Sequence, residues 1–168
     1  MVFIEERLKR INLYFTPLAA IVIIFAVLIS NADAIVATIG LGLVLFSIFF
    51  NNLTAVAANE KKSKIIVPLR VIINMLINVI LVYIFIPYWI PIWLLFVLSS
   101  LGVAFYSNFL KTFVISFLLA VVLIVIFYLR VVPNLVSPIT KLIEVGQIVN
   151  YSLFIIIVPC LVNKIIKS

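Results

Sequence analysis

The chain has 168 residues, of which 67% are hydrophobic and only 10% are charged. A soluble domain is nearer half apolar and a quarter charged, so this composition excludes a water-exposed globule and indicates an integral membrane protein. The net charge is +7, but the basic residues lie in short segments between apolar runs, which is typical of membrane topology and argues against nucleic-acid binding.

Uncharged apolar runs predict an all-α, polytopic membrane protein with six transmembrane helices in a single membrane domain, residues 1–168. The first helix is predicted at about 11–30, because roughly 20 residues span about 30 Å, the thickness of the hydrocarbon core. An amphipathic segment over residues 4–11 is expected to lie before it in the headgroup region. Asp33 is well placed to cap the second helix, predicted at about 34–58.

The third helix is predicted at about 65–86, after the most polar segment of the chain, residues 59–64. Segment 87–91 contains two prolines with aromatic residues between them, which interrupts a helix and favours the membrane–water interface. It divides a run of about 40 uncharged residues into two spans. The fourth and fifth helices are therefore predicted at about 91–106 and 109–132.

The sixth helix is predicted at about 145–162. Before it, Ser137 and Pro138 form a pair that favours a helix start, an N-cap residue followed by proline. Residues 138–145 are then either a short interfacial helix of their own or the first turns of the sixth helix, and the sequence leaves both open.

The basic residues predict the orientation of the chain. If the N-terminus is inside, ten of the twelve basic residues lie at the cytoplasmic side, and Arg130 and Lys141 lie outside. Because cytoplasmic loops are rich in Lys and Arg, both termini are predicted to face the cytoplasm across a cytoplasmic (inner) membrane.

The ionisable residues argue against catalysis by this chain. The sequence has no histidine, and its acids all lie outside the predicted mid-membrane regions: Glu5, Glu6, Asp33, Glu60 and Glu144. This removes the usual general base and the common metal ligands, and it leaves no carboxylate at depth for a proton relay. The prediction is a non-enzymatic protein without a metal or another cofactor.

A polar stripe on the third helix is the strongest candidate site. Arg70, Asn74 and Asn78 are four residues apart, so their side chains share one helix face. Arg70 can extend toward the headgroups, but an amide facing lipid is costly, so both asparagines should face another helix or a cavity. Two interpretations stay open: hydrogen bonds between helices, or a polar cavity open to the cytoplasm that holds a solute or an anionic lipid headgroup.

The second helix offers a partner face for this stripe. Ser47 and Asn51 lie toward its inner end, and Lys111 approaches the same membrane level from the fifth helix. Together with the stripe they form the predicted ligand-binding set, a cationic vestibule at the inner side. The alternative is that this level is simply the interface, where polar side chains cost little.

A second stripe, of small residues, lies farther out on the second helix. Ala34, Thr38 and Gly42 are four residues apart, which favours close approach of another helix. That helix belongs either to the same chain or to another one.

Three functions are compatible with this pattern. The favoured one is a non-enzymatic membrane subunit or module that packs against other membrane chains or a second copy of itself, and binds a lipid or small ligand. The second is a small-solute transporter or channel, including a substrate-binding subunit of a transporter. The third is a sensory membrane domain whose output domain lies on another chain. Topology alone does not decide among them.

Overall fold

A computed structural model describes the backbone of residues 2–57, 60–135 and 137–167, and the side chains of residues 16–54, 65–135 and 137–167. Within these residues every regular element is a helix, which confirms the predicted all-α class. The elements are α1 (Val2–Ile29), α2 (Ala34–Ala57), α3 (Glu60–Phe85), η1 (Ile90–Trp93), α4 (Leu94–Tyr106), α5 (Phe109–Arg130), η2 (Val132–Asn134) and α6 (Pro138–Lys167), where η marks a 3-10 helix.

The described helices are apolar enough to indicate a membrane protein. Four segments are long enough to cross a bilayer: Ala34–Thr54, Ile65–Phe85, Phe109–Asn134 and Pro138–Lys167. Two shorter apolar segments accompany them, Thr16–Ile29 and Ile90–Tyr106. Large apolar side chains cover the outside of the bundle; Leu28 and Leu142, for example, are 74% and 75% exposed. Such a surface is a liability in water and the expected exterior in lipid.

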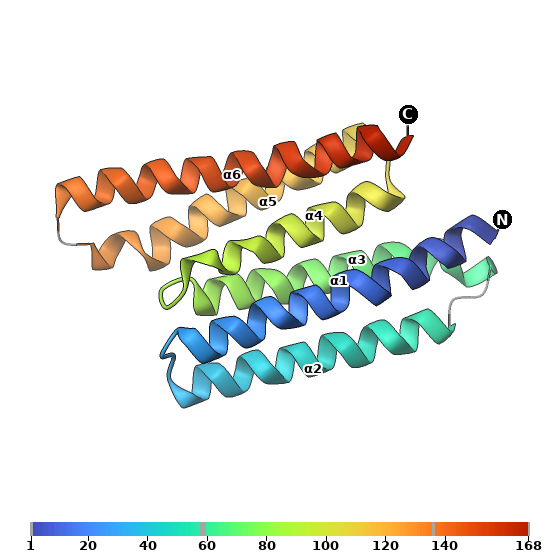
Figure 1. Cartoon of the computed structure of the whole chain (residues 1–168), viewed down its shortest axis with the longest axis horizontal. Helices are drawn as coiled ribbons and strands as arrows, with labels where there is room; N and C mark the ends of the chain where they lie inside the picture. The colour runs from blue at the N-terminus through green and yellow to red at the C-terminus, as the bar shows by residue number, and fades with distance from the viewer. Residues whose placement is uncertain (1, 58–59, 136, 168) are drawn as a thin grey trace.

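The helices run back and forth along one long axis (Figure 1). Both termini and the connection at residues 107–108 lie at one end of the bundle, which we call the terminal end. The connections at residues 30–33, 86–89 and 131–137 lie at the opposite end, which we call the hairpin end. Each helix is therefore antiparallel to the next one in the chain.

The six helices form two groups that share α4. In the first, α1 packs against α2 and α4, and α3 packs against the same two helices, so that α1–α4 form a ring. In the second, α4, α5 and α6 pack against one another. Large side chains from α3, α4 and α5 are fully buried in the core, among them Phe85, Phe96 and Phe127. The centre of this ring is lined by side chains of four different helices.

A glycine permits the close approach of α2 and α3 in this ring. A Cβ atom added to Gly40 would lie 2.6 Å from both Cε2 and Cζ of Phe85, a separation that real Cβ atoms do not adopt. Phe85 is completely buried, so its ring has little room to retreat. The absence of a side chain at Gly40 is therefore what allows this aromatic ring to pack against α2.

The structure decides how the sixth helix begins. Helix α6 runs without a break from Pro138 to Lys167, so residues 138–145 are its first turns and not a separate interfacial helix. The carbonyl of Ser137 accepts the amide of Lys141 at 3.0 Å, which puts Pro138 at the first helical position.

The structure also describes two other boundaries that the sequence predicted. Helix α1 begins at Val2, so the backbone of the predicted lead-in over residues 4–11 is continuous with the first long helix, while its side chains lie outside the described residues. The predicted break at 87–91 is confirmed, because α3 ends at Phe85 and the 3-10 turn η1 precedes α4.

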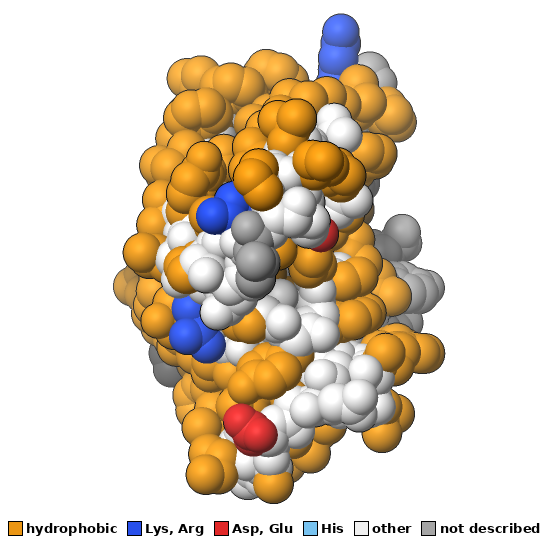
Figure 2. All heavy atoms as spheres, turned by 90° about the vertical axis from the view of Figure 1, so that its left-hand side faces the viewer, with side chains coloured by type: hydrophobic (Ala, Val, Ile, Leu, Met, Phe, Trp, Pro, Cys, Tyr) orange, Lys and Arg blue, Asp and Glu red, His pale blue; other side chains and the backbone are white. Residues whose placement is uncertain are grey.

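Aromatic residues join the connections at the hairpin end, which Figure 2 shows face-on as a largely apolar surface with a few isolated charges. The hydroxyl of Tyr88 donates to Oδ2 of Asp33 at 3.4 Å and joins two of the connections. The ring of Trp93 in η1 stacks on Tyr151, which lies within α6, with 4.6 Å between centroids. The carbonyl of Asp33 also accepts the amide of Ala37 at 2.9 Å, at the predicted capping position of α2. These contacts hold together the end of the bundle that carries few charges.

Candidate functional site

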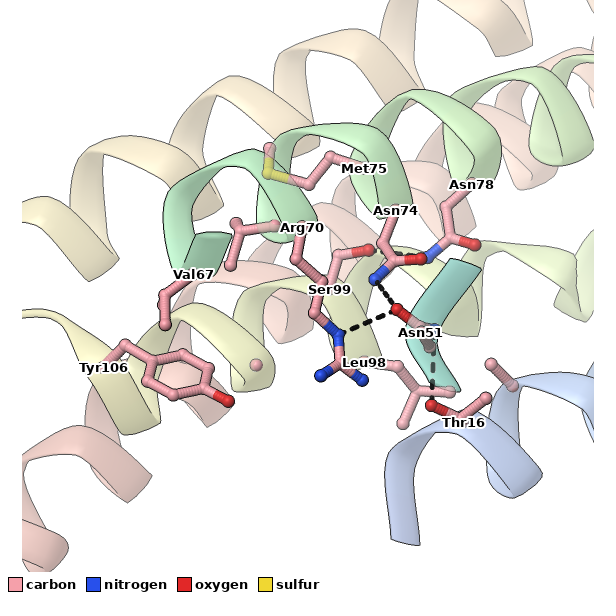
Figure 3. A pocket seen from close by; sticks show the side chains of 13 residues that line it. Thr16, Asn51, Val67, Arg70, Asn74, Met75, Asn78, Leu98, Ser99 and Tyr106 are labelled. Atoms are coloured by element: carbon pink, nitrogen blue, oxygen red, sulfur yellow. Dashed lines mark hydrogen bonds between the residues drawn. The ribbon is translucent and has the colours of Figure 1, made fainter. Parts of the chain in front are cut away.

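A polar cavity lies at the centre of the α1–α4 ring (Figure 3). It measures about 660 Å³, including its open mouth. All four helices line it, with Thr16 and Ala19 from α1, Asn51 from α2, Val67, Arg70, Val71, Asn74, Met75 and Asn78 from α3, and Leu98, Ser99, Gly102 and Tyr106 from α4. Because no single helix builds it, the cavity depends on how the ring packs.

The stripe on α3 supplies most of the polar lining. Steps of four residues place Arg70, Asn74 and Asn78 on one face, and that face looks into the ring. Asn51 comes from α2 to meet them. Ser47 lies one turn before Asn51 and contacts the same group by hydrogen bonds rather than by lining the space. Five of the six residues predicted as a ligand-binding set are thus brought together.

Three side chains close a ring of hydrogen bonds between α2 and α3. Ser47 Oγ donates to Asn74 Oδ1 at 3.1 Å, and Asn74 Nδ2 donates to Asn51 Oδ1 at 2.8 Å. Asn51 Nδ2 donates back to Ser47 Oγ at 3.4 Å, and also to Thr16 Oγ1 on α1 at the same distance. Unpaired amides are costly away from water, so these bonds stabilise the contact among three helices. Hydrogen bonding between helices and a polar cavity therefore occur at the same place.

Arg70 brings a positive charge into this network. Its side chain is only 6% exposed, and its Nε donates to Asn51 Oδ1 at 2.8 Å. Its Nη1 is buried and has no hydrogen-bond partner among the described residues. Figure 3 shows the guanidinium pointing into the cavity, between Tyr106 and Thr16. Because a guanidinium does not lose its proton in proteins, the cavity holds a fixed positive charge with a donor that is not used.

Away from Arg70, contacts between α3 and α4 close the cavity near Asn78. Asn78 Nδ2 donates to Ser99 Oγ at 2.7 Å and approaches the carbonyl of Leu95 at 3.4 Å. These bonds use the amide donor of Asn78 within the protein. Among the described lining residues, the buried donor that stays unused is therefore Nη1 of Arg70.

Several lining residues were not singled out from the sequence as ligand-binding residues. Ser99, Gly102 and Tyr106 are three and four residues apart, which is the spacing of one helix face, so a signal for the α4 lining exists in the sequence. Thr16 has no such signal, because it is an isolated hydroxyl beside Pro17 in an apolar segment. Only the rotation of α1 within the bundle brings Thr16 to the cavity.

Lys111, the remaining member of the predicted set, lies elsewhere. It is exposed in the first turn of α5, where its backbone amide is bound by the capping side chain of Asn108 at 3.0 Å. Helix α5 contributes no residue to the cavity lining. Although Lys111 and Arg70 were expected at the same membrane level, only Arg70 reaches the cavity.

The small-residue stripe on α2 faces outward. Ala34, Thr38 and Gly42 are all exposed, and a Cβ added to Gly42 would meet nothing within 4 Å. The hydroxyl of Thr38 bonds to the carbonyl of Ala34 at 2.7 Å within the helix. Within the described chain, the glycine of α2 that meets a neighbouring helix is Gly40, and the stripe stays open to the surroundings.

A second polar cluster ties α6 to the last turn of α4. Asn163 is 1% exposed, and its Nδ2 donates to the carbonyls of Ala104 at 2.6 Å and Ser107 at 2.9 Å. The amine of Lys167 donates to the same Ser107 carbonyl. A helix leaves its last carbonyls without partners of its own, so these side chains satisfy the end of α4. This cluster is structural, and the sequence analysis did not single out Asn163.

The chemistry that the cavity offers is hydrogen-bond donation around one cation. Its polar groups are amides, hydroxyls and the Arg70 guanidinium. Among the described residues, no three His, Cys, Asp or Glu side chains gather as metal ligands would. No family model, curated protein or solved structure matches this chain, so the site is interpreted from its own geometry.

Proposed function

We propose that this chain is a six-span, non-enzymatic integral membrane protein that holds a lipid or small ligand in the α1–α4 cavity. Both termini face the cytoplasm across an inner membrane, and outward helix faces pack against other membrane chains or a second copy. The observation that carries the proposal is the polar cavity itself, which places amides and a guanidinium among helices whose outer surfaces are apolar.

The cost of polar groups in lipid supports a ligand. Polar and ionisable residues within membrane segments are rare and usually face a cavity or another helix with a function. Helix contacts alone would be satisfied by apolar residues, without a space lined by amides and a guanidinium between four helices. A site that binds small molecules is typically a concave space of this kind, lined mostly by apolar atoms with a few polar groups.

The lengths of two further segments, α1 and residues 90–106, support the proposal of six spans. Helix α1 has 28 residues, which corresponds to roughly 42 Å at 1.5 Å per residue. Residues 90–106 are close to the shortest length that crosses a bilayer, about 17 residues. Both lie antiparallel to their neighbours in the same bundle (Figure 1).

The outward stripe on α2 supports packing against other chains. Ala34, Thr38 and Gly42 are exposed, and stripes of small residues allow helix backbones to approach closely in membranes. Within the described chain no neighbouring atom lies within 4 Å of a Cβ at Gly42, so a helix of another chain has space to approach.

A cavity-filling variant tests the proposed ligand. Gly102 lines the cavity, and a Cβ at this position meets nothing within 4 Å, so Gly102→Leu extends into the space without a backbone clash. Gly146→Leu adds the same side chain at an exposed position of α6, where a Cβ meets nothing within 4 Å, and is the matched control. Each protein is extracted in a mild detergent and its bound non-protein mass is measured by native mass spectrometry.

The wild type and Gly146→Leu are expected to carry the same non-protein species, and Gly102→Leu is expected to lose it. A wild type without any bound species, or a Gly102→Leu variant that keeps it at the wild-type level, would show that the cavity does not serve as a ligand site. The mass of the species identifies the ligand directly.

A further inference from the structure

We infer that the ligand of the α1–α4 cavity is an anion, held through a phosphate or carboxylate group by the Arg70 guanidinium. This inference rests on the proposed function and specifies the chemical class of its ligand. The inference follows from the buried positive charge of Arg70, which no described acidic side chain neutralises.

The first step is the hydrogen-bond count of Arg70. The guanidinium has five N–H donors in a planar fork. Nε is used by Asn51, while Nη1 is buried and donates to no protein atom. Asn51 Oδ1 cannot also accept from Nη1, because it already accepts from Arg70 Nε and Asn74 Nδ2, which uses its two lone pairs. A second acceptor is needed at Nη1, and the cavity is where it has room.

The second step is the charge balance. Of the acids with described side chains, Asp33 and Glu144 belong to the hairpin end, away from Arg70. Glu60 precedes Arg70 by ten positions on α3, and Glu5 and Glu6 precede the cavity residue Thr16 by eleven and ten positions on α1, so the backbones of all three lie roughly 15 Å or more along their helices from the site. Leaving a buried charge without a counter-charge is strongly destabilising, whereas an anion at the cavity would supply both the charge and the acceptor.

The third step is the shape of the donor group. A guanidinium matches phosphate and carboxylate groups, because two parallel N–H donors meet two oxygens. Figure 3 shows the terminal nitrogens of Arg70 and the hydroxyl of Tyr106 turned toward the same space. Tyr106 therefore adds a neutral group that can donate to an oxygen of the anion.

The depth of Arg70 admits two sources for this anionic group. Arg70 lies five positions inside the apolar segment Ile65–Phe85, or about 8 Å along the helix axis. A side chain at this depth reaches the level of lipid headgroups, and it also reaches a solute that enters from water. A lipid phosphate and a free phosphate share the chemistry inferred for the site, so the experiment separates them.

The experiment measures binding of named probes to the purified full chain in a neutral detergent. Sodium phosphate is titrated against sodium chloride at equal ionic strength, and dihexanoyl-phosphatidylglycerol is titrated against dihexanoylglycerol, which has the same tails and no phosphate. The variants are Arg70→Gln, which removes the charge in the cavity, and Lys111→Gln, which removes an exposed charge outside it.

Saturable binding of at least one anionic probe is expected for the wild type. Arg70→Gln should weaken it by about tenfold or more, since a hydrogen bond to a charged group contributes at least that much. Lys111→Gln should stay within about twofold of the wild type, as expected for an exposed charge. Binding of phosphate indicates a free anion, and binding of phosphatidylglycerol alone indicates a lipid headgroup; either result supports the inference.

Three results would overturn it: no saturable binding of either anionic probe to the wild type, unchanged binding by Arg70→Gln, or equal losses in Arg70→Gln and Lys111→Gln. If Arg70→Gln does not fold, Gly102→Leu gives the decision, because it keeps the charge and fills the space, and anion binding must then be lost. A ligand that Gly102→Leu loses and Arg70→Gln retains would leave the proposed function standing and reject the anion.

Discussion

Asn51 is the residue through which three helices of the ring are connected. Its side-chain oxygen accepts from Arg70 on α3 and from Asn74 on the same helix, and its amide donates to Ser47 and to Thr16 on α1. With 3% of its surface exposed, it has little access to water as a replacement partner. The loss of Asn51 therefore affects the cavity and the fold together.

Replacing Asn51 by leucine tests this role. Asn51→Leu leaves the Nε of Arg70 and the amide of Asn74 without their acceptor, so we expect a loss of about 2 kcal/mol in the free energy of unfolding. Asn52→Leu changes an exposed neighbour to the same residue, and we expect a change below about 0.5 kcal/mol. Unfolding in mixed micelles with increasing denaturing detergent measures both. Equal stability of the two variants would contradict the role of Asn51.

At the residue scale, the sequence predicts which polar side chains of α2 and α3 lie together, because these residues are regularly spaced along each helix. Steps of four residues place Arg70, Asn74 and Asn78 on one face of α3. Because an amide that faces lipid is costly, that face is expected to point into the bundle. Thr16 and Lys111 show the limit of this argument. Whether a single polar side chain reaches the cavity depends on the rotation and position of its helix, and these are set by packing among side chains far apart in the sequence.

At the scale of the helix, α2 contains two glycines with different environments. Gly40 and Gly42 are two positions apart, which is roughly 200° around an α-helix, so they face opposite directions. Gly40 meets the ring of Phe85, and Gly42 meets nothing within 4 Å. The stripe with Ala34 and Thr38 predicts close approach at Gly42 by a helix of this chain or of another. Within the described chain the close approach is at Gly40, which has no such stripe, because a large aromatic side chain on α3 lies opposite.

Alanine at each glycine gives a matched pair of variants. In Gly40→Ala the new methyl group would lie 2.6 Å from the ring of Phe85, so we expect a loss of about 1–3 kcal/mol from overpacking. Gly42→Ala should change stability by less than about 0.5 kcal/mol. The unfolding free energy in micelles is again the measurement.

The double variant Gly40→Ala/Phe85→Leu separates crowding from a backbone effect. A smaller side chain at position 85 leaves space for the methyl group, so the two substitutions together should cost less than the sum of their separate effects. Strictly additive losses would mean that the destabilisation of Gly40→Ala does not come from the contact with Phe85.

The ends of the helices were predicted less well than the number of helices. Charge and proline mark the breaks between apolar runs, so the segments themselves follow from the sequence. The sequence does not show that α6 continues through residues 138–145, because Lys141 and Glu144 suit an interfacial helix as well as the first turns of a long one. Local sequence is compatible with both, and the single helix Pro138–Lys167 is what the whole bundle adopts.

At the scale of the whole molecule, the order of neighbours is the feature that sequence cannot supply. Successive helices are antiparallel, as six apolar runs with short connections require. The contacts of α1 with α4 and of α4 with α6 join helices that are not adjacent in the chain. They decide that α1–α4 enclose the cavity while α5 stays outside it, and hence that Arg70 lies in the site and Lys111 does not.

The orientation of the whole molecule can be tested by labelling single cysteines. In a Cys160→Ala background, Asn134→Cys reports on the hairpin end and Lys111→Cys on the terminal end, and both positions are exposed. Because the basic residues are concentrated at the terminal end, a membrane-impermeant maleimide should label Asn134→Cys in intact cells and Lys111→Cys only after permeabilisation. The reverse result would invert the topology, and labelling of both in intact cells would contradict six spans.

The bonds from Asn163 to the end of α4 have a consequence for biosynthesis. Asn163 follows Ala104 by 59 residues, so a ribosome that adds 5–20 residues per second needs about 3–12 s between them. During that delay the carbonyls of Ala104 and Ser107 lack the amide that later binds them. The end of α4 is therefore completed only after most of α6 has been synthesised.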